Sequence, residues 1–198
     1  MASDGGRQAQ RGRPPATSRS ELEQVALHLF AQDGFEETTV DQIAEAAGVG
    51  RRTFFRYYAS KNDVVWGEFD VMLQEMEAYL DKVDGGPLID GLAEAVIRFN
   101  AVPPAAVAAH RQRMALILHV PALQAHSTLR YTEWRDVVAR YVARRTDTSA
   151  DSFDAQLVGQ LALGAAAAAY EEWLRDDRSD LADLLTTAFR TLAAGVDG

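Results

Sequence analysis

The chain has 198 residues, of which 47% are apolar and 25% charged, and it contains no cysteine. This composition is typical of a globular protein with one domain or two small ones. It excludes disulfides, cysteine-ligated zinc and thiol nucleophiles. The sequence has neither the run of about eighteen apolar residues that a membrane span needs nor a secretory signal pattern. We therefore expect a cytoplasmic protein that does not associate with membranes.

The formal net charge of −9 is unevenly distributed along the chain. Residues 1–61 carry eight basic and eight acidic side chains, whereas the rest carries twelve basic and 21 acidic ones. The basic residues of the first part form two clusters, at 7–19 and 51–61. A local positive field can bind nucleic acid even when the whole chain is acidic. Two interpretations stay open: a DNA-binding head on an acidic body, or a solvated acidic helical protein.

Apolar residues recur at the three-and-four spacing of helices, and no alternating strand pattern is present. The sequence therefore predicts an all-α fold of about nine helices. Ser18 with Glu21, and Thr39 with Gln42, have the spacing of capping boxes at helix starts. In chain order we expect helices at 18–33, 39–47, 51–57, 60–83, 88–102, 105–119, 122–145, 152–175 and 180–194.

The second and third of these helices have the pattern of a helix-turn-helix. A tight turn at 47–50 contains two glycines, and Ile43, Ala47, Val49 and Phe54 can lock the two helices together. Such a motif places the surface of its second helix in the major groove of DNA. The polar and aromatic residues available for that surface are Arg51, Arg52, Thr53, Phe55, Arg56 and Tyr57.

The segment Phe30–Val40 (FAQDGFEETTV), together with Ile43-Ala44, Ala47–Val49, Thr53–Tyr58 and Lys61, resembles the N-terminal signature of TetR-family transcriptional regulators. Residues 120–131 further resemble the subgroup found with mycofactocin gene clusters in actinobacteria. The resemblance implies a dimeric, ligand-responsive repressor that binds a near-palindromic operator in double-stranded DNA. It also implies a flexible basic arm at 1–17, a helix-turn-helix domain at 18–62 and a helical ligand-binding and dimerisation domain at 63–198.

The resemblance also assigns candidate DNA contacts. Thr39 and Gln42 would lie against phosphates or a groove edge, Arg51, Arg52 and Thr53 would meet bases, and Lys61 would lie near a phosphate. Phe55 and Tyr57 would face the DNA, and Phe55 could contact a thymine methyl. Arg11 and Arg13, held extended by Gly12 and Pro14, would enter an A·T minor groove. The alternatives are a solvated helix surface for the arginines of the helix and a solubilising tail for the arm.

In TetR-family proteins the last two helices pair with those of a second subunit, and the middle helices enclose a ligand. The candidate dimer residues are Leu157, Leu161, Gly164, Ala168, Leu181, Leu185, Ala188 and Leu192. The candidate ligand-binding residues are Phe99, Met114, Ile117, Leu118, Leu123, Tyr131, Trp134, Trp173, Arg98 and Arg111, with His110 and Arg113 near the same polar mouth. Ordinary core packing is the alternative for each. Apolar walls beside arginines would suit an acyl-CoA or a similar amphipathic anion.

No catalytic signature is present. The sequence lacks glycine-rich phosphate loops, a His-Glu-x-x-His zinc motif and a Gly-x-Ser-x-Gly elbow. His119 and His126 lie seven residues apart with a proline between them, which does not form a chelating pair. We therefore expect no enzyme activity, no metal and no cofactor. The alternative function is a helical small-molecule-binding or scaffold protein without specific DNA binding.

Overall fold

A computed structural model describes residues 18–195, and within that range the chain is all-helical. Three short helices form one end of the molecule: α1 (Arg19–Asp33), α2 (Val40–Ala46) and α3 (Arg51–Tyr57). Both expected capping boxes are present, because the Ser18 and Thr39 hydroxyls accept bonds from the backbone N–H groups of Glu21 and Gln42. Leu22, Ile43 and Phe54 are fully buried and hold the three helices together. We call this three-helix unit the head.

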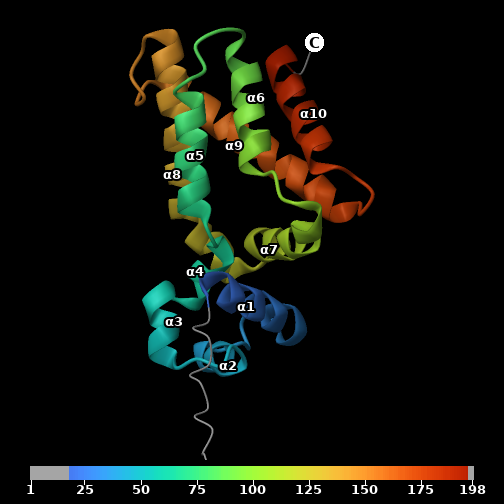
Figure 1. The fold of residues 1–198 in the computed structure, drawn as a ribbon. Coiled ribbons are helices and arrows are strands. Elements are labelled where there is room, and N and C mark those ends of the chain that lie inside the picture. The colour runs from blue at the N-terminus through green and yellow to red at the C-terminus, as the bar shows by residue number, and fades with distance from the viewer. Residues whose placement is uncertain (1–17, 196–198) are drawn as a thin grey trace, which may run out of the picture.

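The body contains the remaining helices. They are α4 (Lys61–Trp66), α5 (Phe69–Leu80), α6 (Leu88–Phe99), the short 3₁₀-helix η1 (Pro104–Ala106), α7 (Val107–His119), α8 (Pro121–Thr146), α9 (Phe153–Arg175) and α10 (Leu181–Ala194). Figure 1 shows α5, α6, α8 and α10 extending away from the head, with α7 crossing between the head and the rest of the body. α9 packs against both α8 and α10, and α10 packs against α6.

The prediction of one helix over 60–83 is wrong, because the chain breaks at Gly67. Gly67 has φ +52° and ψ −120°, which a residue with a side chain rarely adopts, and it separates α4 from α5. The described residues therefore contain ten α-helices instead of about nine. The glycine at the break fits its tertiary surroundings: a Cβ atom at Gly67 would collide with Arg113 Nη1 and lie 2.9 Å from Glu23 Oε2. Helix periodicity alone gave no sign of this close approach.

No single helix within residues 18–195 has the length and hydropathy of a membrane span. One pair, α6 with the η1–α7 segment, meets the criterion only in combination and is bent by 69° between the two parts. The same residues contain no group of three or more potential metal ligands placed to hold an ion.

Candidate nucleic-acid interface and ligand cavity

The solvent-facing surface of α3 carries the residues that the sequence predicts for DNA contact. Phe54 packs inward and is fully buried, whereas the next residue, Phe55, is 44% exposed. Arg51 and Arg52 are exposed, and Thr53 and Tyr57 are half-buried. The helix therefore separates an apolar inner face from a cationic and aromatic outer face, as a recognition helix must.

Arg51 is held in place at this surface by two neighbours. Its Nη1 donates to both carboxylate oxygens of Asp41, at 2.8 and 2.7 Å, and its guanidinium lies over the Phe55 ring at 5.3 Å. Both members of the ion pair are more than 60% exposed, so the pair contributes little to stability. The ion pair instead orients the Arg51 guanidinium. Both bonds to Asp41 use Nη1, so Nε and Nη2 can donate to a hydrogen-bond acceptor on DNA.

Thr39, Gln42 and Lys61 all have structural roles here, and only that of Lys61 was not predicted from the sequence. The Thr39 hydroxyl and the Gln42 side chain close the capping box of α2, with a 2.8 Å bond from Thr39 N to Gln42 Oε1. The Lys61 ammonium donates to the carbonyls of Phe35, Glu36 and Thr38 at 2.6, 3.1 and 3.0 Å. Lys61 thus fixes the loop between α1 and α2. Arg11 and Arg13 lie outside the described residues.

A cavity of about 640 Å³ lies between α1 of the head and α4, α5, the end of α6, α7, α8 and α9 of the body. Six of the predicted ligand residues line it: Phe99, Met114, Ile117, Leu118, Tyr131 and Trp134. Leu123 is fully buried in the core, and Arg98 pairs with Glu94 on the surface at 3.4 Å. Arg111 stacks on Trp173 at 4.3 Å and donates to the Asp176 carbonyl, so neither Arg111 nor Trp173 reaches the cavity. Arg113 and His110 do.

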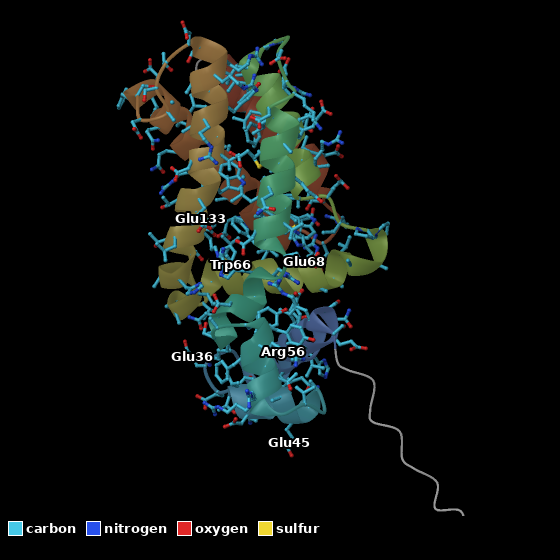
Figure 2. All side chains as sticks on the ribbon, turned by 60° about the vertical axis from the view of Figure 1, so that its left-hand side comes forward. Glu36, Glu45, Arg56, Trp66, Glu68 and Glu133 are labelled. Carbon is cyan, nitrogen blue, oxygen red and sulfur yellow. The ribbon has the colours of Figure 1, made fainter. Side chains whose placement is uncertain are left out.

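The structure adds cavity residues that the sequence analysis missed, and several of them are polar. Figure 2 shows Trp66 and Glu68 at the level where α4 joins the head to the body. Arg19 and Glu23 of α1, Asn100 and Tyr170 also line the cavity. Glu23 could have been noticed because it lies four and seven residues before the buried Leu27 and Phe30, on the inward face of α1.

One side of the cavity carries a directional hydrogen-bond chain. The Asn100 amide nitrogen donates to the Val96 carbonyl at 2.7 Å, which turns its oxygen toward the Tyr170 hydroxyl, a donor at 2.5 Å. Because the only hydroxyl proton of Tyr170 is used there, His110 must donate from Nε2 across its 2.8 Å contact with that oxygen. Burial, with a smaller effect of the Arg113 charge, lowers the pKa of His110 to about 4. The imidazole is therefore neutral at pH 7.

The predicted dimer residues divide into two groups. Leu157, Leu161, Gly164 and Ala168 are exposed along one side of α9, with Leu157 at 40% and Leu161 at 46%. On α10, Leu181 and Leu185 are buried in the core of the chain itself, and Ala188 and Leu192 are half-buried against that core. The apolar face of α10 is therefore largely covered within one chain, and the more exposed apolar stripe belongs to α9.

Comparison with known proteins agrees with this architecture. The family model "Bacterial regulatory proteins, tetR family" matches residues 24–65, and the model "MftR C-terminal domain" matches residues 86–197. The chain belongs to the TetR family of transcriptional regulators, which bind DNA through an N-terminal helix-turn-helix and are not enzymes.

Two relatives and two solved structures illustrate the similarity. A Mycobacterium tuberculosis protein carrying the name mycofactocin biosynthesis transcriptional regulator MftR is 43% identical over 94% of each chain. The regulator TcmR of Streptomyces glaucescens is 31% identical over 88% of this chain and 80% of its own. FadR of Bacillus subtilis, in complex with stearoyl-CoA, has a TM-score of 0.64 at 17% identity, covering 90% of this chain and 99% of its own. Thermus thermophilus FadR, in complex with lauroyl-CoA, has a TM-score of 0.57 at 21% identity, covering 89% of this chain and 93% of its own. These last two similarities concern the fold.

Proposed function

We propose that this protein is a ligand-responsive repressor that binds a near-palindromic operator as a homodimer. The observation that carries the proposal is the outer face of α3, where Arg51 is oriented by Asp41 and Phe55 on a rigidly capped head. Thr53, Arg52, Phe55 and Tyr57 complete the base-reading surface, and Thr39 and Gln42 approach the phosphates from the start of α2. The Lys61 ammonium donates to three loop carbonyls, so near the phosphates it acts as a positive charge instead of a hydrogen-bond donor. Arg11 and Arg13 of the preceding arm would add minor-groove contacts.

DNA binding by Arg51 is tested with fluorescence anisotropy on DNA from upstream of the gene and on a scrambled duplex. Arg51→Ala should weaken operator binding by about 1–3 kcal/mol and scrambled binding by much less, because base contacts specify and phosphate contacts do not. Arg178→Ala is the matched control, since Arg178 is a 91% exposed arginine far along the chain. Equal losses on both duplexes would favour a helical protein without specific DNA recognition.

Dimerisation would use the exposed α9 stripe. Two half-sites multiply affinity for a symmetric operator, whereas one seven-residue α3 contacts few base pairs. Leu161→Glu places a charge on this stripe and should yield a monomer by sedimentation velocity. Leu129→Glu is the control, because Leu129 is 73% exposed on a different helix, α8. A dimer that survives the α9 change would refute this interface.

The cavity would bind the effector, and its long apolar walls suit an acyl chain. The Trp66 indole N–H is buried without a partner in the described part of the chain, and a ligand acceptor would satisfy such a group. The FadR proteins of similar fold were solved with acyl-CoA molecules, which supports the same class of amphipathic anion here. Thermal-shift measurements with acyl-CoAs of graded chain length test this. If none of them stabilises the protein, acyl-CoAs are not the effector.

A further inference from the structure

The head and the body are joined by an ion pair that lies in the cavity wall. Glu23 on α1 and Arg113 on α7 both line the cavity, and Arg113 Nη2 donates to Glu23 Oε1. Their side chains are only 15% and 18% exposed. The pair therefore belongs to both functional parts: one partner is carried by the DNA-binding head, and the other faces the space where a ligand would lie.

The surrounding backbone is shaped around this pair. Arg113 Nη1 also donates to the Val65 carbonyl of α4 at 3.3 Å. Gly67 leaves room for the guanidinium, and the Gly67 carbonyl accepts a 2.7 Å bond from Arg19 of α1. On the other side, the Tyr58 hydroxyl, at the end of α3, lies 3.4 Å from Glu23 Oε2. A single guanidinium thus links α1, α4 and α7 where the head meets the body.

A second anion in the cavity would compete for the same guanidinium. Opposite charges interact more strongly where burial weakens solvent screening, so the mostly buried Arg113 needs a counter-ion, and Glu23 is the carboxylate that pairs with it. A carboxylate or phosphate entering the cavity offers equivalent acceptors, and two anions close to one cation repel each other. We propose that Arg113 binds the anionic group of the effector and that this anion displaces Glu23, which releases α1 from α7.

This inference rests on the proposed ligand-responsive function and gives it a direction. A ligand shifts an equilibrium only through a difference in affinity between two states. In the state with the Glu23–Arg113 pair closed, Arg113 is not available to the anion, whereas in the open state it is. The anion therefore favours the open state, and reciprocity requires operator DNA to lower anion affinity by the same factor if DNA needs the closed state.

The experiment measures operator release by stearoyl-CoA, stearate and the neutral methyl ester of stearate. The wild-type protein should release DNA with an anionic probe and not with the ester. If stearate releases the operator, the group that Arg113 binds is a carboxylate. If only stearoyl-CoA releases it, Arg113 binds the phosphates of CoA. Either result supports the proposal. Equal release by the ester would overturn it.

Three variants separate the ion pair from the rest of the cavity. Glu23→Gln should bind the anionic probe about tenfold more tightly and the operator more weakly, within the usual range of couplings between sites. The double variant Glu23→Met with Arg113→Met keeps apolar packing between α1 and α7, so it should bind operator but not respond to the anion. Glu75→Gln removes an exposed carboxylate of α5 that does not line the cavity, and it is the control. Circular dichroism checks whether each variant folds.

The outcomes distinguish this inference from the function on which it rests. If the double variant releases operator at the same anion concentration as the wild-type protein, the ion-pair exchange is refuted and ligand responsiveness stands. If no probe binds the wild-type cavity, or none affects operator binding, both fail together.

Discussion

The tip of the head and its junction with the body each contain an arginine–carboxylate pair, and the two pairs differ in depth. Arg51–Asp41 is about two-thirds exposed, whereas Arg113–Glu23 is mostly buried. Exchanging the partner of an exposed ion pair takes little free energy, because water solvates either charge. Breaking a buried pair takes much more unless another charge replaces the lost partner. The exposed arginine can therefore turn to DNA freely, while the buried one changes partner only when an anion arrives.

The largest expected effect is a difference in stability between variants on the buried and exposed sides of α3. Phe54→Ala should lower the free energy of unfolding by about 3–5 kcal/mol, because it empties a fully buried site between the head helices. Phe55→Ala, at the neighbouring exposed position, should change stability by less than about 1 kcal/mol and weaken operator binding instead. Urea denaturation and anisotropy on the same samples make the comparison. A stability loss of similar size in both variants would show that Phe55 is structural.

The two ion pairs can be compared directly by truncating their acidic partners. Glu23→Ala should destabilise the protein by about 3 kcal/mol, since it leaves the guanidinium of Arg113 buried without its counter-ion. Asp41→Ala should cost less than about 1 kcal/mol, because Arg51 is solvated. Urea denaturation midpoints measure both. If Asp41→Ala lowers stability more than Glu23→Ala, burial does not determine how much each ion pair contributes to stability.

Gly67 tests how tightly the junction is built. Gly67→Ala should destabilise by about 2 kcal/mol, because alanine is strained at φ +52° and its methyl group would push against Arg113. Gly85→Ala is the control, since a Cβ there meets no atom within 4 Å and no positive φ is involved. Thermal unfolding of both variants checks this. Two unchanged melting temperatures would mean that the guanidinium moves aside without cost.

His110 gives the stability of the protein a pH dependence. Its native pKa of about 4 lies below the ordinary value of 6.5, so the unfolded chain binds the proton more readily. Its contribution to stability is therefore present above pH 6.5 and is lost as the pH falls toward 4. His110→Gln should flatten the stability curve between these values, and His28→Gln is the control in the head. Identical slopes in wild type and His110→Gln would contradict neutral burial.

Local chemistry determined the head almost completely. The capping boxes at Ser18 and Thr39, the glycine turn and the inward Phe54 each depend on residues within a few positions, so the sequence predicted them and the structure confirms them. The same local reasoning marked both α9 and α10 as apolar, but it had no means to decide which apolar face the chain itself would cover.

Tertiary packing decided the rest. The break at Gly67, the absence of Arg111 and Trp173 from the cavity wall and the burial of Leu185 all depend on which distant helices meet. Glu23 and Arg113 are 90 residues apart, and nothing in the spacing of either helix indicates that they pair. Capping and periodicity are properties of one segment, whereas a cavity and a buried ion pair exist only where several segments converge, and that convergence is fixed by the packing of the whole core.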